Sequence, residues 1–402
     1  MPGWDGAMLR RVKISGFRSC RDVELDDLGA MTVLVGRNAV GKTNMLRGIR
    51  WLAKTATSLE GIRPPITPGI ASMEFALPGT TYFYSLKTSR QVIPPGAPGA
   101  ARRIHTTMAE SLAFAAGDGV RQPAFERHNE NVTLWPSETR VEIGHNASCM
   151  PALVSVLPPD SEVARLIRPL LSALETVRYY PLTEGDDEAA PIPQATYEDW
   201  LVHYRATGDP GPSVLMRLLH VALDRQADFE EIRSLLGPDG LGLLANIDAR
   251  TFEGRGKEGK KGGQKFYWLT FAPAMQGSDT ARHFGFEDLS SGTRRIVRMI
   301  VSLIFDQSAI MLLEHPEEGI HRGLLRKLID VLRTYSGRCQ LIIASHSAVV
   351  FDTLDPKSVR LVTMSEGETK VRPLTAEELD AARKYLEEEG TLSDFLEVVD
   401  GG

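Results

Sequence analysis

The stretch Gly36–Thr43 reads GRNAVGKT, which has the spacing G-x-x-x-x-G-K-T. It follows the short apolar run Met31–Val35 and opens the segment Gly41–Leu52, whose apolar residues have helical spacing. A strand, a glycine loop and a helix in this order bind phosphate, because glycines let backbone N–H groups approach phosphate oxygens and a helix N-terminus favours an anion. Lys42 then reaches the β- and γ-phosphates, and Thr43 holds Mg²⁺. The sequence therefore predicts a nucleotide site that includes Gly36, Gly41, Lys42 and Thr43.

A second motif, LSSGTRR at Leu289–Arg295, lies much later in the chain. It opens the predicted helix Gly292–Phe305 with two hydroxyl residues and a glycine. Ser290, Ser291 and the Gly292 amide are suited to meet a γ-phosphate at this helix N-terminus. An ordinary serine N-cap would give the same local pattern.

Two apolar runs that end in chemically useful side chains follow this motif. Ile310–Leu313 runs into Glu314, as a magnesium-binding strand does, and Leu341–Ala344 runs into Ser345 and His346, whose imidazole can contact a phosphate. Short apolar runs that alternate with helices predict a parallel sheet covered on both faces, and so an α/β fold. The other elements that the periodicity predicts are strands at Phe266–Phe271, Thr81–Leu86, Ser111–Ala115 and Asn131–Trp135, and helices at Leu324–Thr334, Ser161–Tyr179 and Ser213–Leu236.

The order of these motifs resembles that of the ABC-type ATPase heads of RecF, SMC and OLD proteins. Within that group, the chain is most similar to the compact RecF/OLD-like AAA-family ATPases. The opening VKISGFRS at Val12–Ser19 and the asparagine Asn38 in the glycine loop also fit this group. The resemblance covers residues 8–55 and 266–365. It implies a P-loop NTPase head formed by residues 1–60 and 266–370, split by an inserted α+β region at 61–265 and followed by a helical tail at 371–402.

The resemblance also implies a mechanism in which two heads dimerise face to face with ATP between them. Arg18, Asn38, Lys42 and Thr43 would bind ATP in one subunit, and Thr43 and Glu314 would hold Mg²⁺. Ser290, Ser291 and Gly292 of the other subunit would complete the site, and His346 would sense the γ-phosphate.

Two positions depart from the wider superfamily. Glu314 stands where aspartate is common, as in the OLD-like branch, and His315 stands where a catalytic glutamate usually orients the attacking water. A neutral imidazole accepts a proton but brings no negative charge to that water. Two alternatives follow, a slow ATPase and a switch that is held by ATP without hydrolysis.

The charge balance limits the partners that the chain can bind. It has 46 Lys and Arg against 52 Asp and Glu, a formal net charge of −6, so nucleic acid would be bound locally and not through bulk charge. The glycine-rich segment Thr251–Lys265 is the candidate, with a solvated hairpin tip as the alternative. Its basic residues are Arg255, Lys257, Lys260, Lys261 and Lys265.

The remaining expectations concern compartment and partners. Three distant cysteines, no apolar run long enough to span a membrane and no secretory signal favour a cytoplasmic protein. Too few residues follow His346 for the Toprim nuclease domain of OLD proteins. We therefore expect a homodimer, or a higher oligomer, that responds to DNA or a phage trigger and controls a separate nuclease or toxin in phage defence or DNA repair. The alternative is an ATP-stabilised scaffold that hydrolyses little ATP and holds such an effector inactive.

Overall fold

The computed structural model describes residues 8–59, 69–93, 103–117, 119–144, 148–181, 191–254, 265–274, 284–387, 390–392 and 394–395. The chain forms two compact units, which are taken in turn. The first contains Met1–Tyr180, Ser308–Pro316 and Arg333–Gly402, and the second contains Pro181–Gln307 and Glu317–Leu332.

A six-stranded sheet forms the centre of the first unit, in the order β10-β14-β15-β3-β16-β17. All neighbours are parallel except β16 and β17. The residues of β3, β14 and β15 are buried throughout, as expected of strands covered on both faces. The strands are β10 (Arg178–Tyr180), β14 (Ile310–Glu314), β15 (Gln340–Ser345), β3 (Met31–Val35), β16 (Val359–Ser365) and β17 (Glu368–Pro373).

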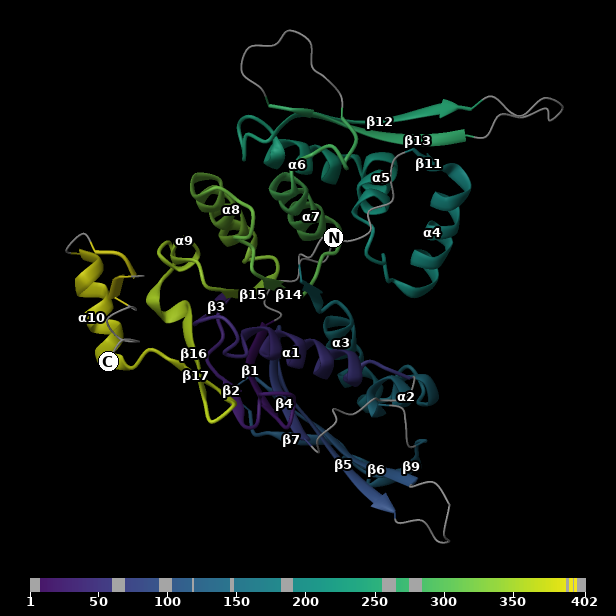
Figure 1. The fold of residues 1–402 in the computed structure, drawn as a ribbon. Coiled ribbons are helices and arrows are strands. Elements are labelled where there is room, and N and C mark those ends of the chain that lie inside the picture. Colours follow the sequence, from purple (N-terminus) through teal and green to yellow (C-terminus); the bar gives the residue numbers. More distant parts are fainter. Residues whose placement is uncertain are drawn as a thin grey trace, which may run out of the picture. The chain divides into compact units, whose positions relative to one another are not determined.

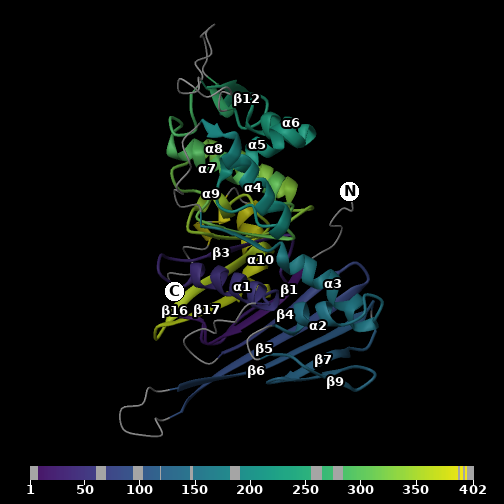
Figure 2. The same cartoon turned by 90° about the vertical axis from the view of Figure 1, so that its right-hand side faces the viewer.

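A second sheet in this unit has eight antiparallel strands in the order β2-β1-β4-β5-β6-β7-β8-β9. In Figure 2 its strands β4 to β7 run side by side. The strands are β1 (Met8–Ser15), β2 (Val23–Leu25), β4 (Gly69–Leu77), β5 (Thr80–Ile93), β6 (Arg103–Ala116), β7 (Gln122–His128), β8 (Asn131–Leu134) and β9 (Thr139–Glu142). The β-rich part of the predicted insertion thus shares one sheet with the N-terminal strand β1. The boundaries expected at residues 61 and 265 stay a prediction.

Helix α1 (Lys42–Ala56) follows the glycine loop and packs against both sheets (Figure 1). Met45, Leu46, Ile49 and Leu52 form its buried stripe, at the spacing that the sequence predicted. The helices α2 (Cys149–Val156) and α3 (Glu162–Glu175) pack on the same core. The rest of the unit is α9 (Ala348–Phe351), the 3₁₀ turn η1 (Pro356–Ser358) and α10 (Ala376–Glu387).

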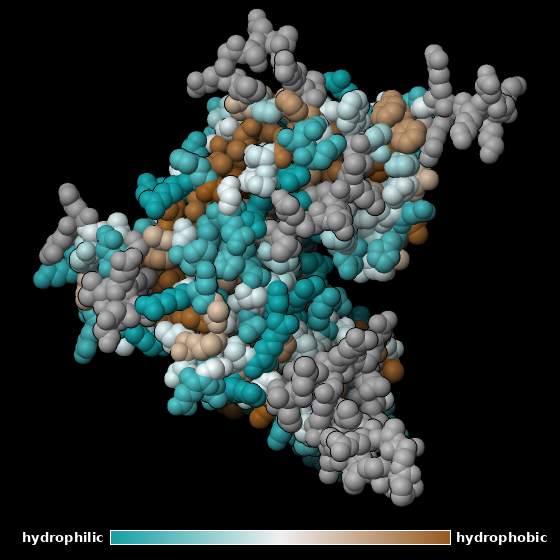
Figure 3. Space-filling model, viewed as in Figure 1, coloured by the Kyte–Doolittle hydropathy of each residue, from teal (hydrophilic) through white to brown (hydrophobic). Residues whose placement is uncertain are grey.

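The second unit combines five helices with a three-stranded sheet in the order β11-β13-β12. Phe252 and Trp268 lie on the hairpin formed by β12 and β13, and are 38% and 44% exposed. Figure 3 shows hydrophobic residues gathered over the end of the hairpin that carries them. The elements are β11 (Ile192–Pro193), α4 (Gln194–Thr207), α5 (Val214–Asp224), α6 (Gln226–Leu236), β12 (Leu244–Glu253), β13 (Lys265–Pro273), α7 (Ser291–Phe305) and α8 (Arg322–Tyr335), whose last three residues belong to the first unit.

The single helix predicted over Ser213–Leu236 is wrong, because the chain breaks at Arg225 into α5 and α6. Arg225 leaves the helical conformation (φ −133°, ψ 62°), and its guanidinium donates to the carbonyl of Phe305 at 3.1 Å, where α7 ends. A cation at a helix C-terminus satisfies carbonyls that lack a partner inside the helix. No helix of the described residues is long and apolar enough to cross a membrane.

Candidate nucleotide-binding site

The glycine loop connects the central strand β3 to α1. Gly41 has φ 104°, and a Cβ atom there would lie 1.9 Å from Oγ1 of Thr369 on β17. A side chain is therefore excluded on both conformational and steric grounds. Ala39 also has a positive φ, 66°. Loop residues 37–39 are exposed, so Asn38 lies at the surface next to the helix N-terminus.

Lys42 is the first residue of α1 and is only 4% exposed. Its ammonium donates to the carbonyl oxygens of Gly36 at 2.6 Å and Arg37 at 2.7 Å. A buried ammonium needs such partners, and it is placed inside the loop where a nucleotide's phosphates would be cradled. The geometry fits the role predicted for Lys42.

The carboxyl ends of the parallel strands bring the predicted metal ligands together. Glu314 ends β14 and is 9% exposed, and the Thr43 hydroxyl donates to its Oε1 atom. A hydroxyl and a carboxylate side by side are oxygen ligands of the kind Mg²⁺ takes in nucleotide sites. Among the described residues no Lys or Arg forms an ion pair with Glu314. The donor set therefore fits Mg²⁺, which Thr43 and Glu314 would hold and which would supply positive charge beside the phosphates.

Two residues beside Glu314 were missed from the sequence, Tyr179 and Arg47. The Tyr179 hydroxyl donates to Oε2 of Glu314, and Arg47 Nε donates to the same hydroxyl at 3.1 Å. Burial and the hydrogen bond to Glu314 raise the pKa of Tyr179, so the phenol keeps its proton at neutral pH. The helical spacing of Thr43 and Arg47 could have indicated a shared face of α1, but no sequence pattern placed Tyr179 beside it.

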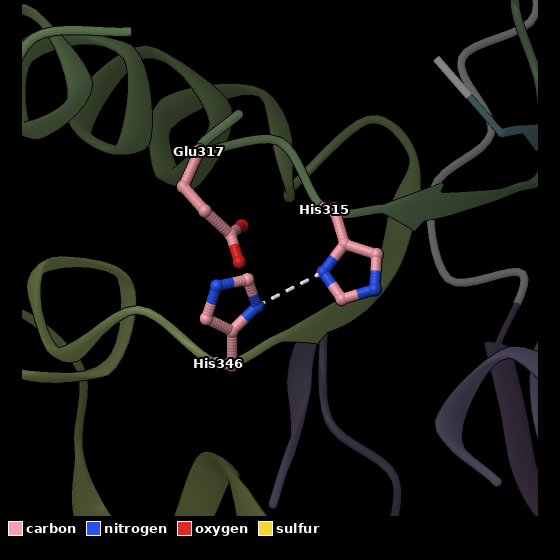
Figure 4. Close-up of side chains that lie close together, drawn as sticks. All are labelled: His315, Glu317 and His346. Carbon is pink, nitrogen blue, oxygen red and sulfur yellow. Dashed lines mark hydrogen bonds between the residues drawn. The ribbon is translucent and has the colours of Figure 1, made fainter. Parts of the chain in front are cut away.

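The two predicted histidines meet at the same edge of the sheet. His315 directly follows β14 with φ 48°, and its backbone N–H donates to Ala344 of β15 at 2.9 Å. Its Nδ1 atom lies 3.2 Å from Nδ1 of His346, which follows β15 (Figure 4). One of these nitrogens donates and the other accepts, according to the tautomer. The structure thus places His315 and His346 as a pair beside Glu314.

The predicted residue Arg18 lies in the turn after β1, also with a positive φ of 54°. Its guanidinium donates to Oδ1 of Asn44 on α1 at 3.2 Å, and Asn44 in turn donates to Ser19 Oγ at 2.8 Å. Ser19 Oγ lies 2.7 Å from Thr369 Oγ1, which donates to the carbonyl of Val40 at 3.0 Å. This network joins Arg18 to the glycine loop, and it explains why a distant threonine, Thr369, belongs to the site.

The LSSGT segment lies in the second unit, at the start of α7. Ser290 caps the helix, since its Oγ accepts from the Thr293 N–H at 3.1 Å, so the ordinary N-cap reading holds for this residue. Ser291 is exposed, whereas Gly292 is buried and a Cβ atom there would lie 2.2 Å from the Gly319 carbonyl oxygen. The glycine is therefore required by close packing, and the helix N-terminus beside it faces solvent through its two serines.

Most of the predicted nucleic-acid segment lies outside the described residues, including Arg255, Lys257, Lys260 and Lys261. Lys265 is exposed at the start of β13, opposite Glu253. Beside it on the hairpin, Phe252 stacks on Phe266 with ring centroids 5.5 Å apart. An aromatic cluster next to Lys265 was not foreseen from the sequence.

Comparisons with known proteins add a family match to this geometry. Residues 276–352 match the family described as AAA domain, putative AbiEii toxin, Type IV TA system. No curated protein matches the chain.

Similar solved structures include three SMC heads. The SmcHead bound to the C-winged helix domain of ScpA has 13% identity and a TM-score of 0.44, covering 93% of this chain and 99% of that one. The SMC head domain from Thermotoga maritima has 14% identity and a TM-score of 0.39, covering 92% and 99%. The Smc head with an extended coiled coil, bound to the C-terminal domain of ScpA derived from Pyrococcus furiosus, has 12% identity and a TM-score of 0.42, covering 95% and 99%.

The glycine loop between β3 and α1, with Glu314 at the end of β14, which is separated from β3 by one parallel strand, defines a P-loop NTPase fold. The family match spans LSSGT and both apolar strands that end in Glu314 and Ser345. The family match over residues 276–352 supports the resemblance to ABC-type ATPases that the sequence predicted.

Proposed function

We propose that this protein binds ATP and Mg²⁺, dimerises head to head and hydrolyses ATP slowly as a switch for a separate effector. The observation that carries the proposal is the convergence of Lys42, Thr43 and Glu314 at one edge of the parallel sheet. Lys42 would bind the phosphates, and Thr43 and Glu314 would hold Mg²⁺.

Dimerisation is supported by the location of LSSGT. Its serines are exposed at a helix N-terminus, where unpaired N–H groups and the helix dipole attract an anion. In the proposed dimer, Ser291 and Gly292 of one subunit complete the ATP site of the other. ATP then stabilises the assembly, which extends to a higher oligomer if further surfaces pair.

A complementation experiment tests this arrangement. Lys42→Ala removes the phosphate contact, and Ser291→Arg blocks the opposing helix terminus, so each variant alone should stay monomeric with ATP and Mg²⁺. Mixed together, they should form dimers that retain one intact site, because one subunit still has its loop and the other still has its LSSGT segment. Mass measurement with and without ATP distinguishes the monomers from the dimers.

Matched controls are available for both variants. Lys54→Ala changes an exposed lysine on the same helix, and Ser137→Arg adds the same charge at another exposed serine. Both should dimerise like the wild type. The head-to-head dimer would be contradicted if the mass of the wild type were the same with and without ATP. It would also be contradicted if the mixed variants stayed monomeric with ATP and Mg²⁺.

Slow hydrolysis is proposed from the residue after Glu314. His315 adopts φ 48°, a conformation that histidine tolerates better than most residues with a Cβ. His315→Glu should raise phosphate release, because a carboxylate orients water better than a neutral imidazole. His315→Asn keeps a residue suited to this backbone and adds no carboxylate, so it should not raise release. Equal rates in all three proteins would reject the idea that His315 limits turnover.

The switch role rests on the family description, which names a putative toxin in a Type IV toxin–antitoxin system. We propose a DNA- or phage-derived trigger and a partner nuclease or toxin in defence or repair, acting in the cytoplasm. The hairpin that carries Lys265 is the candidate DNA contact. Lys265→Glu should then weaken DNA binding and reduce its dependence on salt, and an unchanged salt series would exclude this contact.

The second candidate function is an ATP-stabilised scaffold that holds its effector inactive. The histidine at position 315 favours it, because the usual carboxylate is replaced. ATP-dependent assembly without phosphate release, together with an effector that is freed when ATP is withdrawn, would select the scaffold over the ATPase switch.

A further inference from the structure

The carboxylate of Glu314 is held from two sides by hydroxyl groups. Thr43 donates to Oε1 and Tyr179 donates to Oε2. Thr43 is in the first turn of α1, directly after the nucleotide loop, whereas Tyr179 comes from the three-residue edge strand β10. The two oxygens therefore have different neighbours, and only Oε1 faces the other proposed Mg²⁺ ligand.

Tyr179 is itself fixed by α1. Arg47 donates to its hydroxyl at 3.1 Å, and the Arg50 guanidinium lies 5.4 Å from the centre of its ring. Arg47 is one helical turn after Thr43, so both project from the same face of α1. A hydrogen-bonded chain thus runs from Arg47 through Tyr179 to Glu314, and its first bond strengthens the second. Thr43 donates to the other oxygen of the same carboxylate.

Strand pairing fixes the height of Tyr179 along the sheet. β10 pairs in parallel with β14, and Tyr179 is opposite Leu312, two residues before Glu314. The backbone of β10 is therefore tied to the same strand whose end carries the carboxylate. Tyr179 needs no movement of the backbone to reach Glu314.

We propose that Tyr179 is the positioning residue of the Mg²⁺ site: it holds Oε2 of Glu314 so that Oε1 stays directed toward Thr43. This inference rests on the proposed ATP and Mg²⁺ binding. Without the hydroxyl, the Glu314 side chain rotates more freely, and capturing Mg²⁺ requires it to be ordered again. Groups that orient a metal ligand typically change metal affinity or activity by about 10- to 100-fold when they are removed.

The test measures binding of a fluorescent ATP analogue across a series of Mg²⁺ concentrations. Tyr179→Phe keeps the ring beside Arg47 and Arg50 but loses the donor to Glu314. We expect the Mg²⁺ midpoint to rise about 10- to 100-fold, while binding of the analogue in EDTA stays as in the wild type. Hydrolysis in the variant should recover at high Mg²⁺, which a folding defect would not do.

The matched control is Tyr82→Phe, at a buried tyrosine whose hydroxyl makes no hydrogen bond with the described residues. It should keep the wild-type Mg²⁺ midpoint. Arg47→Gln should raise the midpoint by less than Tyr179→Phe, and Arg50→Gln, which removes only a ring contact, should leave it unchanged. The Mg²⁺ midpoint should therefore shift in proportion to the hydrogen bonds that each variant removes, and not with the loss of packing against the Tyr179 ring.

The outcomes separate this inference from the proposed function. A wild-type protein that binds the analogue with a Mg²⁺ midpoint equal to that of Tyr179→Phe would overturn the role of Tyr179 and leave the nucleotide site standing. A wild-type protein that shows no Mg²⁺-dependent binding would overturn both. A shift that appears equally in EDTA would also reject the inference, because the defect would then be in the loop and not at the metal.

Discussion

A buried glutamate from a strand lies near each end of helix α1, Glu314 at its start and Glu110 at its end. The two carboxylates differ in the groups that compensate their charge. Near the start of α1, Glu314 accepts hydrogen bonds from Thr43 and Tyr179. Near its end, Ser148 Oγ lies 2.9 Å from the carbonyl of Ala56 and 2.7 Å from Oε1 of Glu110. Each glutamate thus has one tyrosine and one aliphatic hydroxyl as neighbours, since Tyr84 also donates to Glu110 at 2.9 Å.

The difference is the cation. Arg127 lies 3.6 Å from Glu110 with both side chains fully buried, and Arg127 also donates to the carbonyl of Gly144 at 2.9 Å. The chain itself supplies a cation to Glu110, whereas the groups that donate to Glu314 among the described residues are the hydroxyls of Thr43 and Tyr179, with Arg47 acting on it from beyond Tyr179. A buried charge without an adjacent counterion costs free energy, so under the proposed function Glu314 would take its cation from solution and Glu110 would not.

Arg127→Met should have the largest effect, because it leaves Glu110 buried without its cation. We expect a loss of about 3–5 kcal/mol in the free energy of unfolding, measured by denaturant titration. Adding Glu110→Gln should recover part of that loss, since a neutral amide needs no counterion. If the double variant is no more stable than Arg127→Met, the ion pair is not what makes this region sensitive.

Glu314→Gln should have the opposite profile. We expect Mg²⁺-dependent hydrolysis to fall by about 100-fold or more, while the free energy of unfolding stays equal or rises, because an unpaired buried charge is removed. Glu377→Gln, at an exposed position on α10, is the control and should change neither quantity. A marked loss of stability in Glu314→Gln would show that the two glutamates are alike after all.

The nucleotide side of this comparison was largely predictable from the sequence. The runs IMLLE and QLIIAS are apolar without alternation, so they had to be buried strands of a parallel sheet, and the residues after them had to meet at one edge. Glu314 and His346 followed from that rule, whereas His315 followed from the resemblance to the wider superfamily.

The residues that hold the site and the fold in place were not predictable from the sequence. The physical reason differs from residue to residue. The helix predicted over Ser161–Tyr179 is wrong at its end, because α3 stops at Glu175 and Tyr179 lies in the three-residue strand β10, which is too short for periodicity. Its partner Glu314 is 135 positions away. Glu110 and Arg127 share their strand faces with the apolar residues Leu112 and Phe125, two positions away, but only the pairing of β6 with β7 brings the two charges opposite each other. The break at Arg225 depends on the end of α7, which is a tertiary contact that no local propensity reports.

The smallest expected effect separates the hydroxyl groups at the two glutamates. Ser148 is fully buried, and its single proton serves either Glu110 or Ala56, so Ser148→Ala should cost about 1–3 kcal/mol of unfolding free energy by leaving an acceptor unsatisfied. Thr43→Ala removes the corresponding hydroxyl at Glu314, where the acceptor retains Tyr179 and lies near the solvent-exposed loop. It should leave stability nearly unchanged and raise the Mg²⁺ requirement for nucleotide binding. Denaturant titration and Mg²⁺ titration of both variants measure these two effects. If Thr43→Ala destabilises the fold as much as Ser148→Ala, the hydroxyl at the start of α1 has a structural role, and Glu314 is not a metal ligand in waiting.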